Sequence, residues 1–397
     1  MSRINAQRLK RFAQHQLGLD SYLRDAGDGR PRPQIAAATI VWALLIGQIA
    51  RRSSYHGVEE LLRSPARPQL AVSRRCGDDT LGYCTERLDA GKLRGALATA
   101  ARRAKRNKAF ENSRWVGLAL DGTGAGHVTR ARCALCHPLR NAAADITGYL
   151  HHFAMVSIVG TGISLPVDVE PWGPGDCEYE ASQRLLRRVV EALGRRFADY
   201  VAGDGLYATA PFLNTATDLG LSVVARLKDN LPHLYAAAQR YFRSRAPSHT
   251  FMHGADRIEL WDADGFPPWE DLRWERVRVL RYRQHKADGT IVEAYWLTSF
   301  PLKLCGSRAL FHLAKSRWEI ENHGFNDGKT RHGMEHLRHH HANSLLIDWL
   351  LIALALLIER LFRLRFLHRG TSTPLAAQTF VTYLWLSFGT ARRADTS

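Results

Sequence analysis

The sequence lacks an apolar run that is long enough to cross a membrane. Its two most apolar stretches are residues 35–50, which are short, and residues 345–362, which Asp348 and Glu359 interrupt. A bilayer core of about 30 Å requires about 20 apolar residues in succession. We therefore expect both stretches to be buried core helices. No apolar segment follows the basic residues 1–12, so we expect a cytoplasmic protein that has no membrane partner.

Cysteine and acidic residues are also sparse. Six cysteines in a chain expected in the cytoplasm favour thiols or metal ligands over disulfides. The 38 acidic residues are outnumbered by 55 lysines and arginines, which gives a net charge of +17. This excess indicates a polyanionic partner, most often nucleic acid, because each neutralised phosphate releases condensed counterions. The alternative is a basic protein that its charge keeps soluble.

Changes in hydrophobic periodicity divide the chain into five segments. The first is a helical region in which we expect DNA to bind. The second and fourth form one catalytic core, the third is a β-rich insertion, and the fifth is an apolar helix with a polar tail. In chain order, the first to fifth segments are residues 1–110, 111–229, 230–303, 304–368 and 369–397.

The second segment has the pattern of an α/β fold. Short apolar runs predict a strand at 114–122, a hairpin at 149–171 with a "GTG" turn, and later strands at 199–205 and 221–228. The run at 178–197 has helical spacing, and a short helix precedes the last strand. This order predicts an open mixed sheet flanked by helices.

A basic run closes the N-terminal segment. In "ARRAKRNK" the cationic side chains include Arg102, Arg103, Lys105 and Arg106. Such a run is typical either of a surface that contacts phosphates or of a solvated helix end, and the overall charge does not separate the two.

Two of the predicted strands end in an aspartate. Asp121 closes "LALDGT" and Asp204 closes "VAGDGLY". The C-terminal ends of strands line the crevice in which open α/β sheets bind ligands. Either aspartate alone could be a simple turn residue, but two of them on neighbouring strands favour a shared site. Asp168 and Glu170 are alternatives to Asp204, less suitable because they lie within a strand or at its tail.

A third carboxylate is expected from the stretch "SRWEIENHGFND". One or two carboxylates suffice to hold each Mg²⁺ ion, and two ions serve phosphodiester cleavage. On an α-helix, Trp318, Glu321 and Phe325 share one face, whereas Glu319 and Asp327 project toward solvent. A carboxylate on an apolar face needs a partner. That partner would be a metal ion or, alternatively, a buried arginine.

A second group of candidate ligands follows the first strand. The motif "CALCH" supplies Cys133 and Cys136, and His151, His152 and Cys177 come later. Zinc takes four nitrogen or sulfur ligands in a tetrahedron. The three cysteines with either histidine would therefore form a structural Zn²⁺ site. Reduced thiols without a metal are the alternative, because one C-x2-C pair lacks a matching second pair.

The joint pattern of Asp121, Asp204 and "RWEIE" resembles the Asp-Asp-Glu transposases of bacterial insertion sequences. The group in question carries its glutamate in a Tyr-x2-Arg-x3-Glu-x6-Lys signature and has a β-rich insertion before it. Glu321 lies four residues after Arg317, as this signature requires. The sequence departs from it twice, because Ala314 occupies the tyrosine position and Lys329 stands one residue late.

The resemblance implies a ribonuclease-H-like core that binds two Mg²⁺ or Mn²⁺ ions. Asp121 would contact both ions, while Asp204 and Glu321 would each hold one. Water would cut DNA at the element end, and the freed 3′-OH would attack target DNA. A homodimer on DNA is expected because two ends must be paired. Arg317 and Lys329 would contact phosphates.

Two tryptophans are further candidates for DNA contact. Trp296 and Trp318 would stack on an unpaired base near the cleavage point, or they pack in the core. For the whole protein, the alternatives to a transposase are another metal-dependent DNA nuclease with this core and a DNA-binding regulator or relic without activity. The long insertion disfavours the nuclease, and the three intact acids disfavour the relic.

Overall fold

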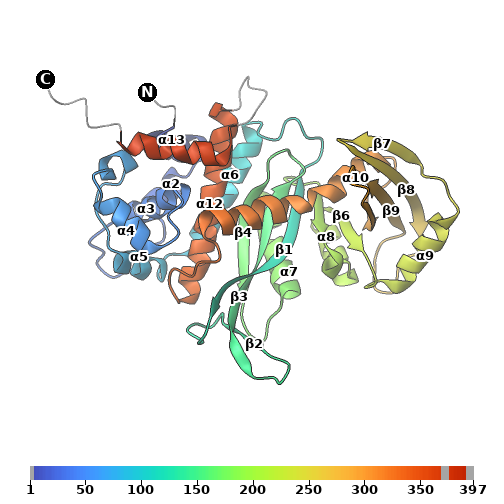
Figure 1. The fold of residues 1–397 in the computed structure, drawn as a ribbon, viewed down its shortest axis with the longest axis horizontal. Coiled ribbons are helices and arrows are strands. Elements are labelled where there is room, and N and C mark those ends of the chain that lie inside the picture. The colour runs from blue at the N-terminus through green and yellow to red at the C-terminus, as the bar shows by residue number, and fades with distance from the viewer. Residues whose placement is uncertain (1–3, 368–374, 390–397) are drawn as a thin grey trace.

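A ten-stranded sheet connects a helical N-terminal region to a second group of strands near the opposite end of the molecule (Figure 1). The computed structural model describes residues 4–367 and 375–389. The helices before the sheet are α1 (Ala6–Arg11), the π-helix η1 (Phe12–Gln16), α2 (Asp20–Arg24), α3 (Ala37–Ile49), α4 (Tyr55–Arg63), the 3-10 helix η2 (Arg67–Leu70), α5 (Asp78–Thr85) and α6 (Ala90–Arg106). As expected for residues 35–50, α3 is almost wholly buried.

The first half of the sheet has the predicted mixed topology. Its strands are β1 (Gly117–Val128), β2 (His137–Arg140), β3 (Ile146–Val159), β4 (Leu165–Trp172), β5 (Tyr200–Gly203) and β6 (Ser222–Leu227). In the order β4-β3-β1-β5-β6, the first three strands are antiparallel, and β1, β5 and β6 are parallel. Helix α7 (Glu178–Leu193) precedes β5, and α8 (Ala210–Asp218) precedes β6. This is the arrangement expected of a ribonuclease-H-like core.

The predicted hairpin at 149–171 is formed by β3 and β4. Gly160 and Gly162 have φ angles of 73°, which side chains rarely adopt, and they make the turn between the two strands. Strand β1 is longer than the predicted 114–122. It continues beyond Asp121 because β3 extends with it and supplies hydrogen-bond partners as far as Val128.

The β-rich insertion continues the same sheet and is not a separate module. It consists of α9 (Pro232–Arg243), β7 (His249–His253), β8 (Asp256–Phe266), β9 (Val277–His285) and β10 (Ile291–Thr298). The strands are antiparallel, as predicted, but β9 and the second half of β10 are buried on both faces rather than alternating, and helix α9 was not expected. Strand β10 pairs with β6, with Tyr295 opposite Leu227, so that one ladder joins the two halves.

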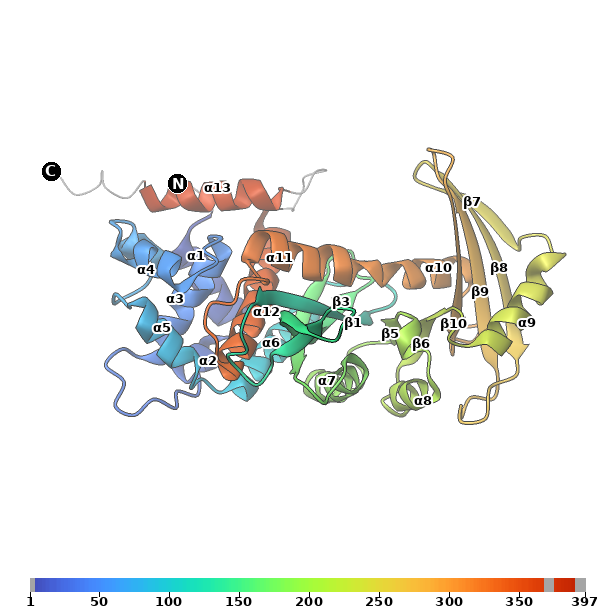
Figure 2. The ribbon, with the colours of Figure 1, turned by 60° about the horizontal axis from the view of Figure 1, so that its bottom comes forward.

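The C-terminal helices cover the sheet and contact the N-terminal region. They are α10 (Ser307–Ser316), the π-helix η4 (Ile320–Phe325), α11 (Asn326–His332), α12 (Ala342–Leu367) and α13 (Ala377–Gly389). From α10 to α11 the chain crosses from the β7–β10 end to the helical end (Figure 2). The predicted C-terminal helix is α13. The remainder of that segment, residues 369–374 and 390–397, lies outside the described part of the chain.

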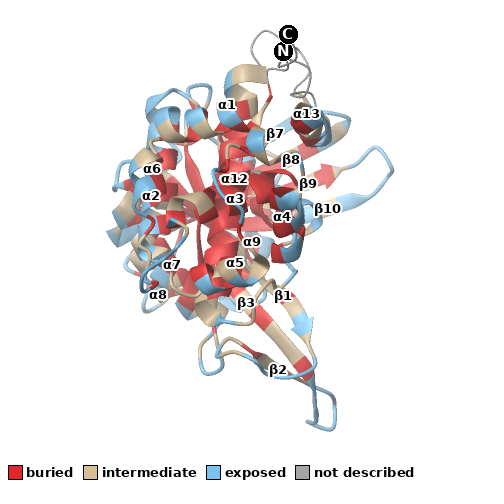
Figure 3. Cartoon of the chain, turned by 90° about the vertical axis from the view of Figure 1, so that its left-hand side faces the viewer, coloured by how far each residue is buried: buried red, intermediate tan, exposed pale blue. Residues whose placement is uncertain are grey.

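The buried residues run continuously through the helical region and the sheet, while the tip of the β2–β3 hairpin projects with exposed residues (Figure 3). Helix α12 is buried as residues 345–362 predict, and it packs on β4, α3 and α6. Its buried Glu359 pairs with Arg51, 2.7 Å away, which ties α12 to the N-terminal helices. Among the described helices, none combines the length and apolarity that a membrane crossing needs.

Candidate active site

The register between β1 and β5 brings Asp121 and Asp204 to equivalent positions. Ala119 and Ala202 form the last pair of this parallel ladder, and each aspartate lies two residues further on. β1 continues as a strand paired with β3, whereas the chain of β5 turns into the 3-10 helix η3 (Gly205–Tyr207). The backbones therefore separate where the two carboxylates stand, at the strand ends where open α/β sheets bind ligands.

Local backbone contacts orient both aspartates. One carboxylate oxygen of Asp121 accepts a hydrogen bond from the N–H of Gly122 (3.0 Å). Asp204 caps the helical turn after β5, and its Oδ1 accepts from the N–H of Leu206 (2.8 Å). Each carboxylate thus retains oxygens that are not used by the backbone.

Glu321 joins this site through an arginine. The guanidinium of Arg317 lies 3.5 Å from Asp121 Oδ2 and 2.6 Å from Glu321 Oε1. Its side chain is 9% exposed, whereas that of Glu321 is 40% exposed. A buried arginine was the alternative partner considered for Glu321, and in this structure Arg317 is that partner. It neutralises two of the three predicted acids at once.

The helical face predicted around Glu321 is wrong in detail. Residues 320–325 form a π-helix, so the 3.6-residue period does not apply there. Phe325 packs against Phe153 of β3, whereas Trp318 packs against Trp296 of β10. The two rings therefore belong to different clusters, and Glu321 does not share one apolar face with both of them.

The other two acids of this stretch do not point to solvent. Glu319 accepts a hydrogen bond from the N–H of Gly160 (3.2 Å), and burial raises its pKa. Asp327 forms ion pairs with Arg360 (2.8 Å) and Arg331 (3.1 Å). Both acids fasten the helical segment, to the β3–β4 turn and to α12 respectively. The expectation of solvent exposure is corrected for both.

Glu178 is a fourth carboxylate that sequence reasoning missed. It is the first residue of α7, and Tyr207 donates a hydrogen bond to its Oε1 (3.0 Å). A Cβ at Gly122 would clash with the Glu178 side chain, so this glycine lets the carboxylate approach β1 next to Asp121. The sequence signal for it was an acidic residue in the first turn of the helix that follows the hairpin. Acidic residues are common at that position in any helix, because they stabilise its N-terminus, so the signal did not indicate a site.

The electrostatics of the site favour a cation. Burial is the main cause that raises the pKa of Asp121 to about 7, and the charges of Glu321, Asp204 and Glu178 raise it further, while Arg317 lowers it. A divalent ion would relieve this repulsion, so the residues fit an oxygen-ligand metal site. Within residues 4–367 and 375–389, however, the carboxylate oxygens of Asp121, Asp204 and Glu321 do not all lie within 4.8 Å of one another.

Asp168 and Glu170, the alternative acids, are engaged elsewhere. Asp168 is buried between Arg94 (3.0 Å) and Arg188 (2.7 Å). Glu170 also pairs with Arg94, at 3.1 Å. These pairs join β4 to α6 and α7. They leave Asp204 as the acid that accompanies Asp121.

Basic and aromatic side chains border the acids. Lys329 Nζ donates to the carbonyl of Gly124 (3.1 Å), three residues beyond Asp121, and pairs with Glu335 (3.0 Å). The half-buried ring of Trp318 has Arg317 at 4.9 Å and Lys315 at 5.1 Å from its centroid. Trp296, in contrast, is fully buried. Stacking of Trp296 on a base stays a prediction, and it would require the ring to leave the core.

The basic run at the end of α6 lies away from these acids. Arg102 donates to the carbonyl of Ala192 (2.7 Å), and Lys105 to that of Arg196 (3.2 Å), at the end of α7 opposite Glu178. Arg103 donates to the carbonyl of His15 (2.9 Å), and Arg106 is exposed. Three of the four cations thus hold neighbouring backbone in this structure. Their contact with DNA stays a prediction.

The cysteine motif forms the second group of ligands. Cys133, Cys136 and His151 converge with their ligand atoms within 4.8 Å of one another. Cys177 is exposed at the start of α7 and is not part of this group. His152 is not part of it either, since its ring stacks on Trp172. Of the two predicted histidines, the structure selects His151.

A ribonuclease-H-like sheet with acids from β1, β5 and a helix packed across it defines a class of nucleic-acid-processing enzymes. Comparison with known families identifies which family of this class the chain belongs to. The family described as "Transposase DDE domain" matches residues 148–358, which is more than half of the chain and includes Asp204 and Glu321. The chain therefore belongs to the DDE transposase family.

Solved structures show the same fold. The chain is similar to the piggyBac transposase as seen in the cryo-EM structure of its synaptic complex with hairpin DNA. The two share 11% sequence identity, and the match covers 97% of this chain and 80% of that one with a TM-score of 0.50. A search of curated proteins finds no match.

Proposed function

We propose that this protein is a transposase that cuts DNA at the ends of a mobile element and joins the resulting 3′-OH to target DNA. The observation that carries the proposal is that Asp121 lies within electrostatic range of Asp204 and Glu321, with Arg317 in contact with both Asp121 and Glu321. Membership of the DDE transposase family supports the same reaction class.

The three acids are the proposed ligands of two Mg²⁺ or Mn²⁺ ions. Asp121 has both neighbours within electrostatic range, so it is the acid suited to contact both ions, while Asp204 and Glu321 would each hold one. Bound ions would supply charge stabilisation for the attacking and leaving oxygens of an in-line displacement. Glu178 reinforces the negative field from the α7 side.

Arg317 is proposed to exchange partners when substrate arrives. In the protein alone its guanidinium neutralises Asp121 and Glu321. Once cations take over that task, the guanidinium would be free to donate to a phosphate next to the scissile bond, a geometry that suits its planar fork. Lys329 contacts the carbonyl of Gly124, three residues beyond Asp121, and would hold a neighbouring phosphate.

Trp318 is proposed to support an unpaired base. Its ring is half-buried, and the cations of Lys315 and Arg317 lie against it, so base and phosphate could be held together. The N-terminal helices are proposed to bind element ends, and a homodimer is proposed to pair them. The exposed Arg106 would add a phosphate contact distant from the cleavage point.

The test is a DNA cleavage and joining assay with Mg²⁺ or Mn²⁺ on duplexes that carry the element ends. We expect Asp121→Asn, Asp204→Asn and Glu321→Gln each to abolish both steps while DNA binding persists. Asp218→Asn removes an exposed acid outside the site and should cleave and join at the wild-type rate. Cleavage without joining would instead support a nuclease, and near-wild-type cleavage by any of the three variants would contradict the ligand assignment.

A further inference from the structure

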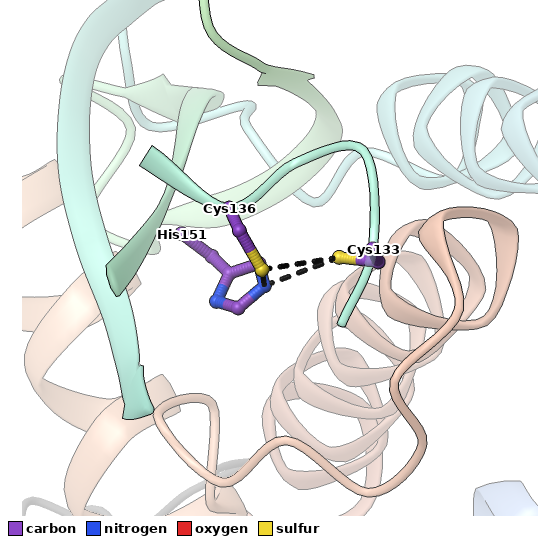
Figure 4. A group of neighbouring side chains, drawn as sticks. All are labelled: Cys133, Cys136 and His151. Atoms are coloured by element: carbon purple, nitrogen blue, oxygen red, sulfur yellow. Dashed lines mark hydrogen bonds between the residues drawn. The ribbon is translucent and has the colours of Figure 1, made fainter. Parts of the chain in front are cut away.

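The thiols of Cys133 and Cys136 and the ring of His151 face one point, about 13 Å along the sheet from Asp121. Ala125 pairs with His151 as Asp121 pairs with Met155, and four residues of a strand span this distance. Figure 4 shows the three side chains pointing toward one another from the loop before β2 and from β3. The group is therefore separate from the acids of the proposed active site.

The spacing of the ligand atoms matches a tetrahedral zinc ion. The two Sγ atoms are 3.8 Å apart, and His151 Nε2 lies 3.3 Å from Cys133 Sγ and 3.4 Å from Cys136 Sγ. Bonds of about 2.3 Å to sulfur and about 2.0 Å to nitrogen give tetrahedral edges of about 3.8 Å and about 3.5 Å. Two thiols and one ring nitrogen thus stand where three ligands of one ion would stand.

The surrounding hydrogen bonds prepare these atoms to bind a metal. His151 Nδ1 lies 3.3 Å from the carbonyl of Gly126, so Nδ1 carries the hydrogen and Nε2 keeps its lone pair toward the sulfurs. The backbone N–H of Arg132 donates to Cys136 Sγ (3.4 Å), which holds the sulfur in place. The His151 side chain is fully buried. This is the outer shell that metal-binding histidines and cysteines usually have.

We propose that Cys133, Cys136 and His151 bind a structural Zn²⁺ ion, and that His340 supplies the fourth ligand. The loop that carries His340 already contacts this region, because Leu337 packs where a side chain at Gly126 would stand. His340 stands outside the group whose ligand atoms lie within 4.8 Å of one another, so its loop would close on the bound ion. It lies within electrostatic range of His151 and Arg132, and its buried Nδ1 has no hydrogen-bond partner in the structure.

His137 is the competing histidine, and the sheet register argues against it. His137 pairs with Leu150 on β3, so its side chain shares the face of Leu150 and His152. Its ring indeed contacts that of His152. His151 points to the other face, because side chains alternate along a strand. His137 also lies within electrostatic range of His151 and has a buried Nε2 without a hydrogen-bond partner, so the sheet register is what favours His340 over His137.

The proposed ion would fasten two segments that flank the acids. One is the loop between β1 and β2, and the other is the segment 333–341 that follows α11. Zinc would link them through coordinate bonds to its ligands, and the free energy of zinc binding would add to the stability of the folded protein. Its role is structural, since four protein ligands leave no open position for a substrate.

The test uses the full-length protein, purified without chelator, and measures zinc by elemental analysis and Co²⁺ coordination by absorption spectroscopy. We expect about one zinc per chain and an intense tetrahedral Co²⁺ spectrum with thiolate charge-transfer bands. Cys133→Ser, Cys136→Ser and His151→Gln should lose both signals. Cys177→Ser and Cys305→Ser, which alter cysteines outside the group, should keep them.

The fourth ligand is tested by comparing His340→Gln with His137→Gln. We expect the first variant to lose most of its zinc and to shift the Co²⁺ spectrum away from tetrahedral, and the second to match the wild type. The reverse result, or no effect of either, overturns the assignment of His340. Wild-type protein without zinc or a Co²⁺ spectrum, including protein with an oxidised Cys133–Cys136 pair, overturns the site itself. Neither readout requires DNA cleavage, so the proposed function is tested separately.

Discussion

At the scale of single residues, the acids of the candidate site and Arg317 form an arrangement that holds together without a metal. Asp121 is mostly buried among like charges, which raises its pKa to about 7. Arg317 offsets that repulsion by contacting two acids with one guanidinium. The arginine and a divalent cation therefore compete for the same carboxylates.

This competition predicts the behaviour of Arg317→Gln. Without divalent ions the variant should have a lower melting temperature than the wild type, because Asp121 and Glu321 lose their shared counterion. Added Mn²⁺ should raise the melting temperature more in the variant than in the wild type, since tighter binding to the folded state stabilises it by RT ln(1 + [L]/Kd). Thermal unfolding with and without Mn²⁺ measures both effects.

Arg331→Gln is the matched control, because Arg331 is in the same helical segment but pairs with Asp327. Its response to Mn²⁺ should equal that of the wild type. If Arg317→Gln shows no larger response than this control, Arg317 does not compete with the metal.

Glu178 yields a second prediction at this scale. Glu178→Gln keeps the size of the side chain and an acceptor for Tyr207 but removes a negative charge near Asp121. We expect DNA cleavage to fall about 10–100-fold, as for other groups that support a metal site, and more Mn²⁺ to restore part of the rate. Initial rates over a Mn²⁺ series measure this.

The control for Glu178 is Glu180→Gln, which removes an exposed acid from the same helical turn. It should cleave DNA at the wild-type rate. Equal rates for Glu178→Gln and Glu180→Gln would show that the fourth acid has no part in the reaction.

The candidate acids differ in how far the sequence could predict them. Asp121 and Asp204 each follow an apolar run and precede a glycine, and the parallel register makes the strand ends coincide. The sequence does not distinguish Glu178 from a helix-capping residue. Its approach to Asp121 depends on the space left by Gly122, which is distant from it in the sequence. Glu319 and Asp327 were misjudged for the same reason, as their partners Gly160 and Arg360 are distant in sequence.

At the scale of elements, the helical segment that carries Glu321 depends on close approach to the sheet. A Cβ at Gly324 would lie 3.2 Å from Met155 Sδ and 3.5 Å from Ser157 Oγ, so a larger residue would push η4 away from β3. Gly333 ends α11 in the left-handed conformation, with φ of 65°. The segment is thus fixed by a glycine in its π-helix and another after its end.

We predict that Gly333→Ala destabilises the protein by more than the strain of its backbone alone. An L-residue in the left-handed region costs about 1–2 kcal/mol, and here the new methyl group would also clash with Cβ of Ser53. Gly289→Ala is the matched control, because its φ is 83° and nothing lies within 4 Å of the added Cβ. Urea denaturation should show a larger loss for Gly333→Ala; equal losses would contradict the packing argument.

The elements themselves were largely predictable, and their details were not. Apolar runs identify the core strands and α12, which are buried on all sides, and helical spacing identifies α7, which buries one side. The π-helix η4 is invisible to such a period, since one extra residue per turn changes which side chains share a face. Helix α9 was missed because its segment is dominated by the strands that follow it.

At the scale of the whole molecule, the sheet makes the catalytic core and the insertion one body. Sequence periodicity predicts that β10 is a strand but not that β6 is its neighbour, because pairing partners are set by tertiary packing. A buried ion pair fastens the strands within the insertion. Arg278 on β9 contacts both carboxylate oxygens of Asp262 on β8, at 2.8 and 2.5 Å, and donates to the carbonyls of Phe300 and Cys305.

The last prediction follows from this continuity and concerns Asp262→Asn. Removing one partner of a buried ion pair leaves an uncompensated charge and costs about 3–5 kcal/mol. Because β10 pairs with β6, the two halves of the sheet should unfold together. In hydrogen exchange measured in urea, we expect peptides of β1 and β3 to lose protection at the same urea concentration as those of β8 and β9. The substitution should lower that concentration equally for both sets. Asp264→Asn is the control, because Asp264 pairs loosely with the exposed Arg276 at 3.8 Å and should shift neither set. If only β7–β10 lose protection in Asp262→Asn while β1 and β3 keep it, the insertion unfolds by itself and the sheet is not a single cooperative unit.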